Sequence, residues 1–341
     1  MEQYVGLDVS MEETSVCVMD AVGTVVWEGK VASTPAALAR ALRRQAPHAV
    51  RVGLETGPLS TWLWHELRAA GVPVVCVDAR HAQAALSMRI NKTDRNDAQG
   101  LAQLVRMGWY REVKVKGLPA HADGALLASR ALLVAHRCEM ENQIRGLLKN
   151  FGLRPTATTG QAFGQSAAAL AAKQPMLRQV VAAMLAVWSS LRQQIAVLTR
   201  QVQNQVIGDA VCRRLMTMPG VGPMTALAFR TAIDDPARFA HSRSVGAYLG
   251  LTPRRYASGE TDRMGRISRC GDPLARSYLF EAANIMLGRA RKANPLKSWG
   301  TKLAKRAGFK KARVALARKM AVVLHRMWMD GTDFGAHLLA A

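Results

Sequence analysis

This sequence lacks several motifs that often indicate the class of a protein, namely paired cysteines, paired histidines and a phosphate-binding loop. The 341 residues include only five cysteines, which stand far apart and form no Cys-x-x-Cys pair. This pattern argues against a disulfide framework and a structural zinc site, and it fits a reducing cytoplasm. The sequence also contains no His-x-x-x-His spacing and no Gly-x-x-x-x-Gly-Lys loop, the patterns of a histidine metal site and of nucleotide hydrolysis.

Long apolar runs and acidic residues are also few. No apolar run approaches the roughly 18 residues that a membrane-spanning helix needs, so we expect no membrane partner. Lys and Arg number 47 against 24 Asp and Glu, which gives a net charge of +23. Such a surplus favours a polyanionic partner, and we expect nucleic acid.

The charge is unevenly spread and suggests three domains. Residues 1–120 carry 14 basic and 12 acidic side chains, residues 121–208 carry 9 and 3, and residues 209–341 carry 24 and 9. We therefore expect a front domain able to hold a cation, a helical middle region, and a basic C-terminal domain suited to a phosphate backbone.

The first 120 residues have the pattern of a mixed α/β domain. Val-rich alternating segments predict strands, and amphipathic segments predict helices. The predicted strands are 3–9, 14–19, 23–30, 49–55 and 72–78, and the predicted helices are 35–45, 60–70, about 80–89 and 94–108. Hairpin-type strands followed by strands that alternate with helices describe a mixed sheet of the RNase H kind.

The rest of the chain is predicted to be helical. Residues 124–207 have helical spacing, broken only around 152–164, which indicates two long helices in a helical hairpin or coiled coil. In the basic last third, PGVGP at 219–223 is typical of a helix-hairpin-helix motif that holds phosphate, although an ordinary turn between core helices fits equally well. Residues 295–329 predict two basic amphipathic helices.

Four carboxylates in the front domain are candidate metal ligands. Asp8 stands in an apolar strand, Glu55 ends another, and Asp94 and Asp97 share a helix face because they are three residues apart. Carboxylates that converge on one sheet edge repel one another unless divalent cations such as Mg²⁺ or Mn²⁺ lie among them. Taken singly, these acids have other interpretations. Asp94 would cap a helix, Asp97 would be a solvated acid in its first turn, and Asp8 would form a strand-end ion pair.

The segment TPRRYASGETDR, residues 252–263, contains candidate reactive hydroxyls. Pro253 and Gly259 bracket a predicted loop that holds Tyr256 and Ser258. A serine needs a base or a metal to become nucleophilic, and on the residues alone a turn serine is the commoner interpretation. Basic residues here and downstream are candidate nucleic-acid contacts: Arg254, Arg255, Arg263, Arg266, Arg269, Lys310 and Lys311.

Two sets of motifs carry a family resemblance. The order Asp8, Glu55, then KTDRNDA resembles the DEDD catalytic domain of the IS110 family of insertion-sequence transposases, which is similar to the RuvC resolvase. Residues 218–233, 239–272 and 274–286 resemble the C-terminal transposase domain of the same family. SGETDRMGRISRCGD, within the second of these blocks, looks closest to the IS1111 branch.

The resemblance implies an enzyme that cuts and rejoins DNA for transposition. It implies a Mg²⁺ or Mn²⁺ site at the four carboxylates and identifies Ser258 as the residue that attacks DNA covalently. It also implies subunits that pair into a dimer and then a tetramer, and a structured noncoding guide RNA that pairs with donor and target DNA. Two alternatives remain: a RuvC-like structure-selective, metal-dependent endonuclease without a covalent intermediate, and an inactive basic nucleic-acid-binding protein.

Overall fold

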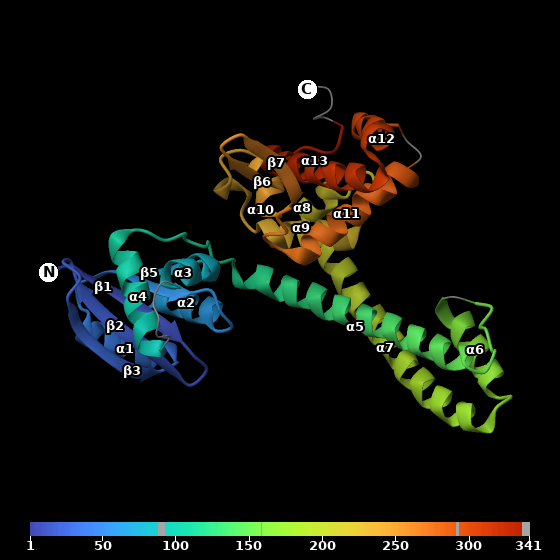
Figure 1. Ribbon diagram of the computed structural model, residues 1–341, viewed down its shortest axis with the longest axis horizontal. Helices are drawn as coiled ribbons and strands as arrows, with labels where there is room; N and C mark the ends of the chain where they lie inside the picture. Colours follow the sequence, from blue (N-terminus) through green and yellow to red (C-terminus); the bar gives the residue numbers. More distant parts are fainter. Residues whose placement is uncertain (88–92, 158, 291–292, 336–341) are drawn as a thin grey trace. The chain divides into compact units, whose positions relative to one another are not determined.

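The computed structural model describes residues 1–87, 93–157, 159–290 and 293–335, and Figure 1 shows the order of its elements. These residues form two compact units, Met1–Lys116 and Gly117–Ala341. The three-domain division expected from the sequence, with boundaries after residues 120 and 208, stays a prediction.

The first unit is built on a mixed sheet with the strand order β3-β2-β1-β4-β5. The sheet pairs β1 antiparallel to β2 and β2 antiparallel to β3, whereas β1, β4 and β5 are parallel. The strands are β1 (Gln3–Val9), β2 (Glu13–Asp20), β3 (Val25–Ala32), β4 (Ala49–Glu55) and β5 (Val74–Val77). These bounds differ by at most two residues from the predicted ones, so the predicted mixed sheet is confirmed.

Helices cover both faces of this sheet. On one face, α1 (Pro35–Gln45) and α2 (Ser60–Ala69) bury Leu38 and Leu63 against the inward-facing residues of β1 and β4. On the other face, α4 (Asp94–Met107) packs Ala98 and Ala102 against Cys17 of β2. The short helix α3 (Ala79–Leu86) precedes α4, and the end of the predicted helix 80–89 lies outside the described residues.

Two glycines determine how closely α4 approaches the sheet. Gly6 of β1 and Gly53 of β4 lie opposite each other in the parallel register. A Cβ atom at Gly6 would overlap the backbone of Ala98 and Ala102, and one at Gly53 would lie 2.5 Å from Cγ1 of Val105. Since any side chain would push the helix away, glycine at these positions lets α4 lie directly on the strands.

Hydrogen bonds at its C-terminal end fix the direction of α4. The Val105 carbonyl accepts from Arg51 early in β4, and Arg106 donates to the carbonyl of Ala21, beyond the end of β2 that pairs with Gln3. The last turn of α4 therefore lies at the amino end of β1 and β4. Its first turn points toward their carboxyl ends.

The second unit begins with long helices. The predicted pair is confirmed as α5 (Leu118–Lys149) and α7 (Pro175–Gly208), which pack against each other. The predicted break between them is wrong in part, because Gly160–Ala171 forms a further helix, α6. Gly164 reads as a helix breaker in the sequence, but it lies against the Trp188 ring, where a Cβ would be 2.7 Å from Cζ3.

By length and composition, α7 is apolar enough to cross a membrane, contrary to the sequence-based expectation. The polar residues that interrupt its apolar stretch are mostly uncharged Ser and Gln, and the many Val, Leu, Ala and Ile residues around them keep the mean hydropathy of the helix high. Core helices of globular proteins also pass this test, but they are mostly buried, whereas 11% of the apolar window of α7 is buried in this structure. In this chain Val181 and Trp188 of α7 are buried against Ile144 of α5 and Phe163 of α6.

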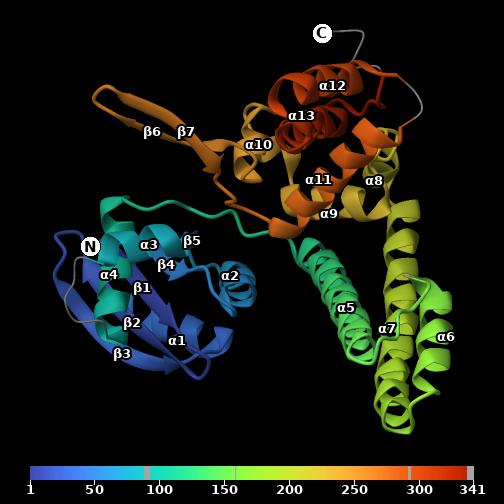
Figure 2. The same ribbon diagram turned by 45° about the vertical axis from the view of Figure 1, so that its right-hand side comes forward.

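The remainder of this unit is a helical body with a two-stranded hairpin. Its helices are α8 (Ala210–Leu215), α9 (Pro223–Ile233), η1 (Pro236–Arg238), α10 (Ser244–Tyr248), α11 (Pro273–Gly288), α12 (Pro295–Ala307) and α13 (Phe309–Asp330). The last two confirm the predicted basic helices. The hairpin, β6 (Pro253–Ser258) and β7 (Thr261–Ile267), replaces the loop expected there and extends from the helices as a long arm in Figure 2.

The PGVGP segment joins α8 to α9, and its first glycine has a packing role. Gly220 has a φ of 88°, and a Cβ there would overlap the Ala282 carbonyl of α11. The close approach to α11 accounts for this glycine. The phosphate-binding role of the segment stays a prediction.

Candidate active site

The carboxyl ends of β1 and β4 place two of the candidate acids in neighbouring positions. Leu7 pairs with Leu54, and Asp8 and Glu55 are the residues that follow them on these parallel strands. Because side chains alternate along a strand, Asp8 shares the face of Gly6, and Glu55 shares the face of Gly53. Both acids are half-buried and lie on the sheet face that α4 covers.

The first turn of α4 supplies the other two candidates. Thr93 caps this helix by accepting a hydrogen bond from the Asn96 amide, so Asp94 and Asp97 lie where the helix dipole favours negative charge. Asp94 is exposed, with its Oδ2 3.8 Å from Nζ of Lys30, and Asp97 is half-buried.

Lys30 connects this turn to the strand-end acids. In the register of the sheet, Lys30 pairs with Ser15, and Ser15 pairs with Asp8. A single cross-strand row therefore runs from Lys30 through Ser15 to Asp8, and Glu55 comes next on β4. The Lys30–Asp94 contact places the start of α4 next to this row.

Glu28 of β3 holds the first turns of α4 in place. It accepts hydrogen bonds from Gln99 and forms an ion pair with Arg95 at 2.5 Å. Burial alone would raise the pKa of the Glu28 carboxyl, but the hydrogen bonds from Gln99 and Arg95 outweigh burial and lower the pKa. Sequence reasoning missed Glu28, because nothing in a strand sequence tells which distant helix will cross it.

The candidate acids fit a divalent cation by donor type, since Mg²⁺ and Mn²⁺ prefer carboxylate oxygens. Among the described residues, however, no three His, Cys, Asp or Glu side chains are gathered closely enough to hold a metal ion. The backbone brings Asp8, Glu55 and the start of α4 to one end of a sheet face. A metal site formed by all four side chains stays a prediction.

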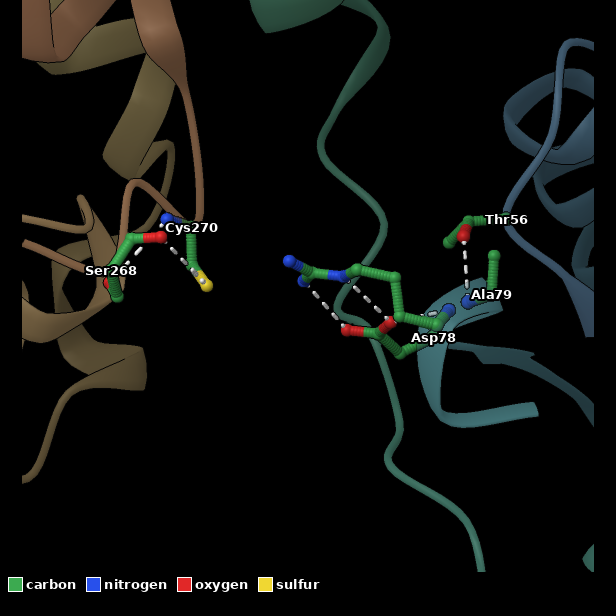
Figure 3. Close-up of polar contacts among 6 residues, drawn as sticks. Thr56, Asp78, Ala79, Ser268 and Cys270 are labelled. Atoms are coloured by element: carbon green, nitrogen blue, oxygen red, sulfur yellow. Dashed lines mark hydrogen bonds and ion pairs between the residues drawn. The ribbon is translucent and has the colours of Figure 1, made fainter. Parts of the chain in front are cut away.

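One further acid lies at the end of the neighbouring strand. Asp78 follows β5 directly, is buried, and caps α3 by accepting from the Arg80 amide and guanidinium (Figure 3). Burial would raise the pKa of Asp78, but hydrogen bonds from Arg80 lower it. In the same region the Ala79 amide donates to the Thr56 hydroxyl, which fastens the chain next to Glu55 to α3. Asp78 is therefore engaged as a structural cap.

In the second unit, Ser258 is the last residue of β6 and not part of a loop. It pairs with Thr261 across a two-residue turn in which Gly259 has a φ of 54°, a conformation that favours glycine. Every residue of β6 is exposed. The serine hydroxyl therefore stands at the tip of an exposed arm, accessible to a large substrate.

The two faces of the hairpin differ in their contacts. Tyr256, opposite Arg263, lies on the Ser258 face; the Arg263 guanidinium is 5.5 Å from its ring centroid, and the ring covers Gly265. On the other face Arg255 donates two hydrogen bonds of 2.8 Å to Asp262.

The other predicted basic residues are exposed. Arg254 and Arg266 belong to the hairpin, and Arg269 follows it with a φ of 56°. Lys310 and Lys311 lie in the first turn of α13, where the helix dipole disfavours positive charge. An anionic partner would offset that cost.

Known proteins resemble both units. The family model DEDD_Tnp_IS110, described as a transposase, matches residues 5–152, and the model described as "Transposase IS116/IS110/IS902 family" matches residues 212–297. A "Probable family 20 transposase" of Pseudomonas aeruginosa is 31% identical over 240 residues, which cover 69% of this chain and 71% of that protein. The chain belongs to the IS116/IS110/IS902 family of transposases.

Other family members match more of the chain at lower identity. The transposase for insertion sequence element IS1111A of Coxiella burnetii is 27% identical over 331 residues, covering 94% of this chain and 88% of that protein. The transposase for IS1328 of Yersinia enterocolitica is 27% identical over 251 residues, covering 72% and 75%. As a transposase of this family, the chain acts on DNA, and its DEDD-type domain indicates dependence on a divalent metal.

Replacing Glu28 with Gln should loosen α4 from β3. We expect a loss of about 1 kcal/mol of unfolding free energy for the first unit at pH 7, because Gln is a weaker acceptor for Arg95. The folded-state pKa of Glu28 is lowered from 4.5, so its contribution is full above that pH and disappears as the pH falls through the folded-state pKa. Urea unfolding of the first unit at pH 7 and at a series of pH values falling below 4.5, with hydrogen exchange followed in β1 and α4, measures both effects.

The matched control is Glu66→Gln on the exposed side of α2. Equal stability of the two variants at pH 7 would contradict the anchoring role of Glu28.

Proposed function

We propose that this transposase cuts and rejoins DNA through a covalent link to Ser258, with divalent cations held by Asp8, Glu55, Asp94 and Asp97. The observation that carries the proposal is the placement of Asp8 and Glu55 at adjacent strand ends, with the Asp94–Asp97 turn next to the same row. The family resemblance supplies the role of the serine.

The four acids would hold the cations, which we propose to be Mg²⁺ or Mn²⁺. Bound there, such ions would polarise the scissile phosphate and stabilise the charge that develops in the transition state. The chain contributes the positions of the ligands. The contacts of Glu28 with Arg95 and Gln99 hold the turn that carries Asp94 and Asp97 against the sheet.

The serine would conserve the energy of the broken DNA bond. Its Oγ attacks the phosphorus of a phosphodiester and loses its proton, and the bond from phosphorus to the leaving strand hydroxyl breaks as that oxygen takes up a proton. Attack by a strand hydroxyl on the phosphoserine reverses these bond changes and rejoins DNA. No nucleotide hydrolysis is needed, which agrees with the missing Gly-x-x-x-x-Gly-Lys loop.

The contacts of Tyr256 favour Ser258 as the nucleophile. The tyrosine ring covers Gly265 and is approached by Arg263, so it already has a packing role in the hairpin. Ser258 lies nearer the turn and is exposed.

The basic residues of this unit would contact nucleic acid. Arg263 lies on the same hairpin face as Ser258, whereas Arg255 is engaged by Asp262, so Arg263 is the better phosphate contact. Arg254, Arg266, Arg269, Lys310 and Lys311 extend this basic surface. We propose that they bind DNA and a structured guide RNA mainly through phosphates, while base pairing reads the sequence.

The long helices would join subunits into a dimer and then a tetramer. Apolar side chains on their outer faces are exposed: Leu132, Met176, Val180, Val187 and Val197. Exposed apolar surface of this kind suits contact with a second helical pair. In such an assembly the carboxylates of one subunit would act with the serine of another.

Asp8→Asn and Asp97→Asn should each lower strand cleavage at least about a hundredfold in Mg²⁺, because an amide cannot replace a charged ligand oxygen. DNA and RNA binding should stay close to wild type, since these acids hold cations and not nucleic acid. Cleavage assays and binding titrations measure the two effects. Glu12→Gln, an exposed acid outside the row, is the control, and wild-type cleavage by either Asn variant would exclude the proposed metal site.

Ser258→Ala should remove the covalent DNA adduct and all recombination while the protein still folds and binds its nucleic acids. Alanine deletes only the hydroxyl of an exposed residue, so stability should change by less than about 0.5 kcal/mol. Denaturing gels of the protein with labelled DNA detect the adduct.

Tyr256→Phe is the matched control, since it deletes a different hydroxyl on the same hairpin face. Loss of the adduct in Tyr256→Phe with its retention in Ser258→Ala would assign the nucleophile to tyrosine. Normal cleavage by both variants with no adduct in any protein would identify a hydrolytic, RuvC-like endonuclease.

A further inference from the structure

The arm that carries Ser258 is joined to the helical body at a narrow root. The residues that enter β6, 248–252, cross those that leave β7, 268–272. The Ser268 amide donates to the Thr252 carbonyl at 2.8 Å, and the Arg269 amide donates to the Gly250 carbonyl at 3.1 Å. Beyond this root, nearly all residues of the hairpin are exposed, so the root fixes the direction of the arm.

Two glycines allow the chain segments of the root to touch. Gly250 has a φ of 68°, and a Cβ there would overlap the backbone of Cys270. Gly271 has a φ of 77°, and a Cβ there would overlap the Tyr248 carbonyl. Both the backbone conformation and the space therefore require glycine.

A single guanidinium ties this crossing to the core. Nη1 of Arg276 donates to the carbonyls of Leu249 and Cys270, each at 3.0 Å, so it holds the entering and the leaving segment together. Arg276 belongs to α11, whose inner face is buried through Leu279 and Met286. The pKa of Arg276 is lowered by burial, but the group remains a cation that these carbonyls stabilise.

Asp272, at the start of α11, and Cys270 make further contacts at the same root. Asp272 caps α11 by accepting from the amides of Leu274 and Ala275, and its carbonyl lies 3.5 Å from Nη1 of Arg276. Cys270 also contacts Ser268, whose hydroxyl accepts from the Cys270 amide at 3.4 Å (Figure 3). Cys270, Asp272 and Arg276 thus connect the base of the arm to the start of α11.

We infer that Arg276 is a positioning residue for strand transfer, acting with Gly250 and Gly271 to set where the hairpin holds Ser258. The inference rests on the proposed role of Ser258. An arm fixed only at its root turns a small rotation there into a larger displacement at its tip. Attack on phosphorus requires the oxygen within about 3–3.5 Å of its target, so misplacement by about 1 Å can cost about a hundredfold in rate.

The test compares Arg276→Gln with Arg289→Gln in the full-length protein. Arg289 is an exposed residue at the other end of α11, so the control makes the same chemical change away from the root. Arg276→Gln should form the DNA adduct at least about tenfold more slowly, while DNA affinity stays within about threefold of wild type. Arg276→Lys, which keeps a cation with several donors, should recover part of the rate.

Hydrogen exchange measures how stable the backbone of the root is, independently of the reaction with DNA. Arg276→Gln should speed exchange at the Ser268 and Arg269 amides and leave residues 279–286 of α11 protected as in wild type. Gly250→Ala perturbs the root without removing a charge and should have the same two effects. Wild-type adduct rates in Arg276→Gln would overturn the inference, whether or not exchange at the root changes.

Failure of the proposed nucleophile and failure of the positioning role are distinguishable. If Ser258→Ala still forms the adduct, the proposed nucleophile is wrong, and the role of Arg276 in placing Ser258 falls with it, whatever exchange at the root shows. If Ser258→Ala abolishes the adduct but Arg276→Gln forms it at the same rate as Arg289→Gln, Ser258 stays the proposed nucleophile and only the positioning role of Arg276 is wrong.

Discussion

The close crossing of α4 over Gly6 and Gly53 is the constraint on which the first unit depends. Without side chains at these positions, the helix lies directly on β1 and β4, and the contacts of Val105 and Arg106 fix its direction. The amino-terminal turn is thereby directed to the carboxyl ends of the same strands. That geometry brings the strand ends that carry Asp8 and Glu55 and the first turn of α4 to the same end of one sheet face.

Under the proposed mechanism, the second unit has a different task, which is to present the Ser258 hydroxyl to DNA. A hydroxyl in a pocket would exclude duplex DNA, whereas a hydroxyl near the tip of an exposed ribbon is accessible but loosely placed. We infer that the glycine crossing and the Arg276 contacts offset this by holding the two chain segments at the base of the ribbon together. The proposed mechanism needs both an accessible Ser258 hydroxyl at the tip of the hairpin and a fixed backbone at its root.

Much of this fold could be predicted from the sequence, because hydrophobic periodicity marked the strands of the mixed sheet and the long helices. Two of the errors arose at glycines. Gly164 reads as a helix break, but it makes room for Trp188, and Gly259 reads as loop, but it closes a tight hairpin turn. Asp8, Glu55, Asp94 and Asp97 were identified as a set from their positions at strand ends and on one helix face, and the family resemblance agreed with that set; their role as metal ligands stays a prediction. Glu28 and Arg276 act through tertiary contacts that leave no local signal.

The proposed divalent cation site lies at the ends of β1 and β4 and at the first turn of α4. Anomalous scattering from crystals of the protein grown with Mn²⁺ tests it directly, because manganese can replace Mg²⁺ and its position can be located independently of activity. We expect anomalous peaks in contact with carboxylate oxygens of Asp8 and Glu55, with Asp97 among the ligands. Saturating Mn²⁺ that gives no peak at these strand ends, or peaks only elsewhere in the protein, would contradict it.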